Sequence, residues 1–166
     1  MAALPGLIKP VSYGRAAYHG VHTFMITAPD GTVRPIRYRW APTVGVDGIT
    51  DDEAVELPHD YLARELEDRL AQGTISFTLN FIVGDTNDPI DDPTIPFPVN
   101  RPRITAGVLT FDRMVEDQHT ECELLSYSPI RVGNGFDVSD DPVLAARGRA
   151  YAASSEQRGA CPVTGG

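Results

Sequence analysis

The sequence contains no run of about 20 apolar residues, the length that a helix needs to cross a bilayer. Its start, MAALPGLIK, also lacks the basic segment followed by an apolar segment that marks a secretory signal peptide. Both absences argue against a membrane or secreted protein. We therefore expect a cytoplasmic protein with no membrane partner.

Positive charge is also scarce. The chain has 14 lysines and arginines against 23 aspartates and glutamates, which gives a formal net charge of -9 and a pI of about 4.7. The arginines are scattered singly or in twos, so no broad positive surface is expected. This composition argues against nucleic acid as a partner.

Cysteines and common catalytic motifs are few. Cys122 and Cys161 are far apart, and no second pair of cysteines completes a zinc site, so free thiols are favoured over a disulfide or a metal role. The sequence has no Gly-x-Ser-x-Gly elbow, no phosphate-binding glycine loop and no His-Glu-x-x-His. Hydrolase, nucleotide-binding and zinc-protease functions therefore have no support.

The chain does have enough apolar content for a folded domain, with 166 residues of which 42% are hydrophobic. Residues 18–28 and 33–40 are rich in β-branched and aromatic types, and the turn sequence PDG lies between them, which predicts a β-hairpin. From Ile36 onward arginine alternates with apolar residues. We expect Arg37 and Arg39 to share a face that is wet or turned towards a ligand.

The remaining pattern predicts one amphipathic helix near residues 59–72 and a helix over 139–158 that ends at Gly159. Ser139 or Asp140 is expected to cap this second helix, and its apolar positions form a stripe. The tail 160–166 is expected to be flexible. Proline-rich residues 91–98 predict an irregular loop, and alternation predicts three further strands at 74–83, 104–111 and 123–127.

The second helix carries the side chains with the clearest chemical potential. Arg147 and Tyr151 are four residues apart and so lie on one face, with Asp141 about one and two-thirds turns before Arg147. A fixed positive charge favours a phenolate, which is a good ligand for ferric iron. On spacing alone, a solvated or core pair stays open.

Two further residues have open alternatives. Arg158 follows Tyr151 by two helical turns and can bind an anion on the same side, although a lone arginine is commonly a surface charge. His22 lies on a predicted strand among apolar residues. A buried histidine with one hydrogen-bond partner competes there with a catalytic histidine.

Several separate segments resemble, in the same order, the second half of the haem catalases, and most closely the small catalase-related peroxidases. The similarity covers nearly the whole chain, so residues 1–166 are interpreted as one catalase-like domain. The segments are YHGVHTF (18–24), IRYRWAP (36–42), DDPTIPFPVNR (91–101) with GVL (107–109), YSP (127–129) and residues 139–158.

This resemblance implies an α+β fold, in which residues 1–135 supply about half the strands of an antiparallel catalase-type β-barrel. Residues 139–158 then form the helix that carries the proximal tyrosine. The implied cofactor is haem b. Tyr151 matches its axial ligand, Arg147 a hydrogen-bond donor to the phenolate and Arg158 a propionate ligand, while His22 and Asp141 match a relay behind Arg147.

The implied function is that of a haem-dependent peroxidase or catalase acting on hydrogen peroxide or organic hydroperoxides. No residue here matches the distal histidine and asparagine of the family, so the chain is expected to be a haem-proximal fragment. An amino-terminal half-chain or a second copy would complete the barrel. The alternative is a haem-binding or scaffold protein without turnover.

Overall fold

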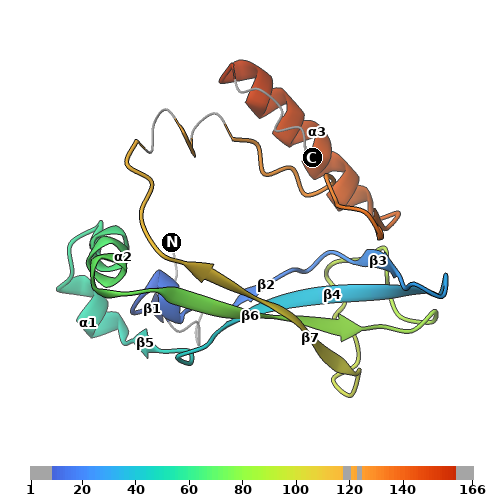
Figure 1. Cartoon of the computed structure of the whole chain (residues 1–166), viewed down its shortest axis with the longest axis horizontal. Coiled ribbons are helices and arrows are strands. Elements are labelled where there is room, and N and C mark those ends of the chain that lie inside the picture. Colours follow the sequence, from blue (N-terminus) through green and yellow to red (C-terminus); the bar gives the residue numbers. More distant parts are fainter. Residues whose placement is uncertain (1–8, 118–120, 123–124, 160–166) are drawn as a thin grey trace. The chain divides into compact units, whose positions relative to one another are not determined.

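The computed structural model describes residues 9–117, 121–122 and 125–159. The chain combines helices and strands (Figure 1), and within this part no helix is long and apolar enough to cross a membrane. Its elements are β1 (Lys9–Pro10), a 3-10 turn (Tyr13–Arg15), β2 (Tyr18–His19), β3 (Phe24–Thr27), β4 (Val33–Pro42), β5 (Gly48–Ile49), α1 (Asp51–Val55), α2 (Tyr61–Gln72), β6 (Ile75–Val83), β7 (Arg103–Phe111), β8 (Phe136–Val138) and α3 (Pro142–Gln157).

The main sheet has six strands, in the order β7-β6-β4-β3-β8, with β2 also paired to β4. Strands β1 and β5 form a separate two-stranded sheet. Among the described residues no pairing joins β7 to β8, so the strands form an open sheet. The mixed fold of helices and strands expected from the sequence is present, and the strands of the described residues do not close into a barrel.

The contacts divide the chain into two compact units, and β4, β6 and β7 each continue from one unit into the other. Of the described residues, the first unit contains 9–19, 39–80 and 105–114, and the second contains 20–38, 81–104, 115–117, 121–122 and 125–159.

In the first unit, α2 confirms the amphipathic helix predicted near residues 59–72. It ends at Gln72, where Gly73 donates its N–H to the Arg69 carbonyl. The short helix α1 was not predicted, although its capping box is readable in the sequence. Thr50 accepts from the Glu53 backbone and the Glu53 side chain accepts from the Thr50 backbone.

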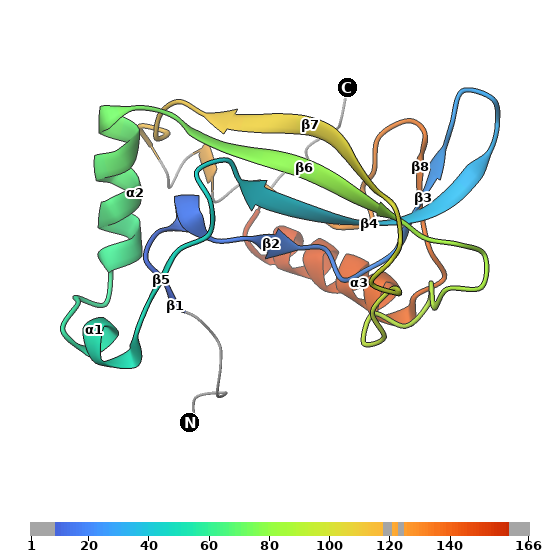
Figure 2. The ribbon, with the colours of Figure 1, turned by 90° about the horizontal axis from the view of Figure 1, so that it is seen from below.

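The second unit is built on the β3–β4 hairpin, as the turn sequence predicted. Phe24 lies opposite Ile36 in its antiparallel register, and Gly31 has the positive φ of 82° that the turn requires. Strand β8 pairs with the other edge of β3 (Figure 2). Phe24, Ile36 and Leu144 form the buried core of this unit.

The strand expected over residues 123–127 is wrong. Residues 125–127 form no strand, and residues 123–124 lie outside the described part of the chain. The strand of this region is β8 instead, which follows a turn at Gly135 with a φ of 82°. Cys122 has a free thiol, and Cys161 lies outside the described residues.

The face of β4 that carries Arg37 was expected to be wet or turned towards a ligand. The wet alternative is wrong for Arg37, which is only 6% exposed. Its Nε atom donates to Thr23 Oγ1 at 3.1 Å, and its guanidinium lies 4.4 Å from the centre of the Phe97 ring. The arginine therefore fixes the proline-rich loop that precedes β7. Its other acceptors are backbone carbonyls of Pro89 (2.9 Å), Asp92 (3.1 Å) and Ile95 (2.7 Å).

We expect Arg37→Lys to lower the free energy of unfolding by about 2–4 kcal/mol, because lysine keeps the charge but lacks the planar fork that reaches these acceptors. Urea unfolding at pH 7 measures the loss. Arg34→Lys on the same strand is the matched control, since Arg34 is exposed. Equal stability of the two variants would contradict the role given to Arg37.

Candidate functional site

Helix α3 carries most of the predicted site residues, and its first turn is fixed by Asp141. The helix spans Pro142–Gln157 rather than residues 139–158, and its N-cap is Asp141 instead of Ser139 or Asp140. Asp141 Oδ1 accepts the backbone N–H of Val143 at 2.8 Å and that of Leu144 at 3.2 Å. These two bonds satisfy backbone donors that every helix start leaves without a partner.

The other carboxylate oxygen of Asp141 contacts His22. His22 Nδ1 lies 2.6 Å from Asp141 Oδ2, and both residues are buried, with exposed fractions of 5% and 1%. An ionised carboxylate only accepts hydrogen bonds, so the imidazole N–H is the donor. The contact joins His22, two residues before β3, to the start of α3, 119 positions later in the sequence.

Hydrogen bonding decides the ionisation of Asp141. Burial by itself raises the pKa of this carboxyl, but the bonds from His22, Leu144 and Val143 outweigh burial and bring the pKa below its ordinary value. The carboxylate also acts on Arg37. Burial lowers the pKa of that guanidinium, and the charge of Asp141 opposes this shift. The interior of the second unit thus contains a paired anion and a hydrogen-bonded cation.

Arg147 and Tyr151 form a second contact further along α3. Arg147 Nη2 donates to the Tyr151 hydroxyl at 3.5 Å, which is a long hydrogen bond, and the guanidinium carbon lies 5.8 Å from the ring centre. Both side chains are partly exposed. Arg158, the C-cap residue, donates from Nε to the Ser154 carbonyl at 3.3 Å. At 100° per residue, the three side chains fall within about 40° around the helix axis.

The structure therefore brings the predicted residues together in two groups rather than in one line. His22 contacts Asp141, and Arg147 contacts Tyr151, but within the described chain no hydrogen bond or ion pair joins His22 or Asp141 to Arg147. Both carboxylate oxygens of Asp141 are occupied by His22 and by the helix start.

The expected apolar stripe of α3 is also reduced to Leu144, because Val143 is 48% exposed.

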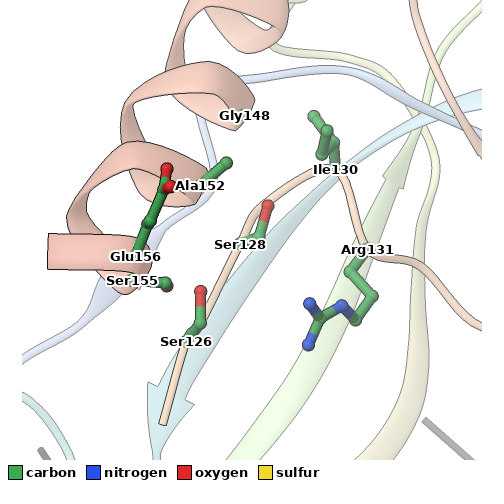
Figure 3. Close-up of a pocket in the computed structure, with 8 residues that line it drawn as sticks. All are labelled: Ser126, Ser128, Ile130, Arg131, Gly148, Ala152, Ser155 and Glu156. Carbon is green, nitrogen blue, oxygen red and sulfur yellow. The ribbon is translucent and has the colours of Figure 1, made fainter. Parts of the chain in front are cut away.

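The sequence interpretation missed a pocket on the neighbouring face of α3. It lies between this helix and residues 126–131 (Figure 3). The sequence does contain a signal for this pocket. Small residues recur at the spacing of one helix face, at Gly148, Ala152 and Ser155. The lining residues are Ser126, Ser128, Ile130, Arg131, Gly148, Ala152, Ser155 and Glu156.

The chain has known relatives that identify its family. The family model described as Catalase matches residues 5–162, so this chain belongs to the catalase family. The resemblance noted in the sequence is thereby confirmed.

The relatives include small and large members. The catalase-related peroxidase of Mycolicibacterium paratuberculosis is 31% identical over 162 residues, which cover 95% of this chain and 51% of that protein. The catalase-related peroxidase of Synechococcus elongatus is 29% identical, with 90% of this chain and 44% of that protein covered. Catalase-3 of Arabidopsis thaliana is 30% identical, with 90% and 32% covered. The chain spans about half the length of the two peroxidases.

Solved structures support the fold. A fungal catalase superimposes with a TM-score of 0.83 at 24% identity, covering 90% of this chain and 32% of that one. Catalase A of Saccharomyces cerevisiae gives a TM-score of 0.83 at 21% identity, with 90% and 33% covered. The described elements therefore follow the fold of the corresponding third of these catalases.

We expect Asp141→Asn to lower the free energy of unfolding at pH 7 by about 1.5–3 kcal/mol, because a charge-assisted hydrogen bond is lost while the size of the side chain is kept. The folded pKa of Asp141 is depressed, so its contribution is present above the unfolded value of about 3.9 and disappears as the pH falls through the lower folded value. The difference from the parent chain should shrink below about pH 4.

Urea unfolding at pH 7, 5 and 3 measures this effect, with the exposed neighbour Asp140→Asn as the control. The control should change stability by less than about 0.5 kcal/mol. An Asp141→Asn loss that stays the same at all three pH values would show that the charge of Asp141 does not stabilise the fold.

Proposed function

We propose that this chain is the haem-proximal part of a catalase-family oxidoreductase acting on hydrogen peroxide or organic hydroperoxides, with Tyr151 as the axial ligand of haem b. Family membership supports this proposal, and so do the printed names of the relatives, two of which are catalase-related peroxidases. The observation that carries it is the Arg147 guanidinium 3.5 Å from the Tyr151 hydroxyl on one face of α3.

The donor groups on this face fit a haem. A phenolate oxygen is an established axial ligand of haem iron, and the positive charge of Arg147 favours the phenolate form. Arg158 adds a second guanidinium to the same face, and guanidinium groups suit carboxylates such as haem propionates. Bound haem would supply an iron centre that exchanges electrons with peroxide.

His22 and Asp141 would act by positioning the helix. Asp141 caps α3 and is held by His22, which directly precedes the buried Thr23 and Phe24. The start of α3 is thereby tied to the β3–β4 hairpin within the same unit. A ligand on a helix anchored in this way is held ready for its metal, which limits the cost of ordering the site on binding.

We expect Tyr151→Phe to lose at least about tenfold in haem affinity or to shift the Soret band, since phenylalanine has no oxygen to donate to iron. Titration of the purified chain with haemin, followed by absorption spectroscopy, measures both. Tyr13→Phe, an exposed tyrosine outside α3, is the matched control and should titrate like the parent chain. An unchanged haem spectrum in Tyr151→Phe would refute the ligand assignment.

The second candidate function is haem binding without turnover. It is favoured by the position of the assigned groups, because all of them lie on the ligand helix α3 or hold its start in place. They are Tyr151, Arg147, Arg158, His22 and Asp141. We propose that the groups acting on peroxide come from a complementary amino-terminal half-chain or from a second copy. General acid–base help of that kind is worth about 10²–10⁴-fold.

We expect the haem-loaded chain at low concentration to consume hydrogen peroxide within about tenfold of free haemin, since it lacks this acid–base help. A rate per haem that rises with chain concentration indicates a second copy. A rate that rises only after the amino-terminal half of a related peroxidase is added indicates a complementary chain. Rates that stay near free haemin in both arms favour the non-catalytic binder and contradict the peroxidase proposal.

A further inference from the structure

Strand β7 leaves one edge of the main sheet open. It runs beside β6 at the end of the strand order (Figure 2), and in the described part of the chain no strand pairs with its other edge. All nine residues of Arg103–Phe111 are exposed except Gly107, which is half-buried. The other edge strand, β8, has only three residues. A long open edge is a template for a further strand, and proteins commonly shorten or cover such edges.

The backbone of β7 has hydrogen-bonding groups that point away from β6. Pro102, directly before the strand, accepts the Val83 N–H through its carbonyl at 2.9 Å. In an antiparallel pair, successive residues alternate between bonding the neighbouring strand and pointing away from it. Arg103 and Thr105 therefore direct their N–H and C=O groups to the open edge. This edge has no acidic side chain within the strand, so it carries no repeated charge that would repel a partner.

Side-chain contacts indicate a β-bulge near the centre of β7. The Thr105 hydroxyl donates to the Asn80 side chain at 3.4 Å, and the hydroxyls of Thr110 and Ser76 lie 2.8 Å apart. Ser76 and Asn80 are four positions apart on β6 and so share a face. Thr105 and Thr110 are five positions apart and would lie on opposite faces of a regular strand. One extra residue between them, next to Gly107, restores the shared face.

We propose that two copies of this chain form a dimer by antiparallel pairing of their β7 edges, about a two-fold axis between Gly107 and Val108. In this register Thr105 of each copy lies opposite Thr110 of the other copy. Both threonines share a face within each copy, as the residues of an antiparallel pair must, and threonine pairs are favourable there. Without the bulge this register would place opposite residues on different faces.

Charge favours a second copy as the partner. The same register places Arg103, the first residue of β7, opposite Asp112, which directly follows the strand. The two-fold axis repeats this pair at the other end of the contact. Both residues are exposed, and Asp112 has a 3.9 Å ion pair with its exposed neighbour Arg113. Opposite charges that face each other across two strands are stabilising, whereas like charges are destabilising.

Apolar side chains contribute on the other face of β7. There the Phe111 ring contacts that of Phe77, with ring centres 6.2 Å apart. The proposed register places Ile104 opposite Phe111 and Ala106 opposite Leu109. Ile104 is 55% exposed, Phe111 45% and Leu109 38%, so pairing removes apolar surface from water. Pairs of aromatic and β-branched residues are also favourable across strands.

The dimer deepens the second-copy alternative of the proposed function and in that respect rests on it, but its measurement needs no haem. Light scattering of the haem-free chain should show the mass rise with concentration from 18.0 kDa to twice that value. The expected dissociation constant is about 1–100 μM, as for small interfaces. A monomer at about 500 μM would overturn the proposal. Growth beyond the dimer would do so too, because a two-fold contact closes.

Charge reversal tests the register. Arg103→Asp and Asp112→Arg should each weaken the dimer at least about tenfold, because each places like charges opposite each other twice. An equimolar mixture of the two variants should form a mixed dimer with about the parent affinity, since both pairs then have opposite signs. Arg34→Asp, the same change at an exposed position of β4, should dimerise like the parent chain. Failure of the mixture to dimerise would refute the register.

Two further measurements identify what covers the edge. Thr105→Pro removes an N–H that points to the open edge, so it should abolish the dimer and keep the unfolding transition. A dimer that survives this change would contradict pairing through β7. Addition of the amino-terminal half of a related peroxidase should leave the dimer intact. Replacement of the dimer by a mixed complex would assign the edge to a complementary chain and overturn the proposal.

The Tyr151→Phe variant separates this inference from the haem proposal. Tyr151 lies on α3, outside β7, so the variant should dimerise like the parent chain. Loss of haem binding with retained dimerisation is the expected result. A parent chain that binds haem but stays monomeric would overturn the dimer alone, and a dimer that does not bind haem would overturn the haem proposal alone.

Discussion

The buried carboxylate of Asp141 is the group on which the arrangement of the site depends. It is 1% exposed and accepts three hydrogen bonds, from the His22 ring and from two backbone N–H groups at the start of α3. A carboxylate without such partners would be too costly to bury, and it would become protonated instead. With these partners it joins the hairpin to the helix. The positions of Tyr151 and of the serine-lined pocket both follow from this connection.

The same hairpin also carries a buried positive charge. Arg37 follows Ile36 on β4, and its guanidinium binds carbonyls of the proline-rich loop together with the hydroxyl of Thr23, the residue after His22. Strand β4 thus carries the buried cation Arg37. His22, two residues before β3, contacts the buried anion Asp141. The Phe24–Ile36 pair lies in register next to them and packs on Leu144. A single antiparallel register therefore places the core and both polar anchors at once.

The sequence predicted the elements that depend on residues close together in the chain. The hairpin, α2, β6 and β7 follow from turn residues and from the period of apolar residues, and they lie close to where they were expected. The burial of Arg37 was missed because alternation shows that two faces differ, not which of them another segment covers. The three-residue strand β8 exists only through its pairing with β3. The contact between His22 and Asp141 spans 119 positions, so the resemblance to catalases, rather than spacing, suggested it.

Helix α3 differs from an ordinary surface helix in how it is held. A helix of this length is commonly fixed by a continuous apolar face, yet Leu144 is its only fully buried apolar side chain among the described residues. Its anchors, Asp141 and Leu144, both lie at its start, and its later turns carry Tyr151 on one face and the pocket on the next. Any molecule that binds either face only in the folded state stabilises the helix by mass action. A ligand on either face would therefore stabilise the later turns of α3, which have no fully buried apolar side chain among the described residues.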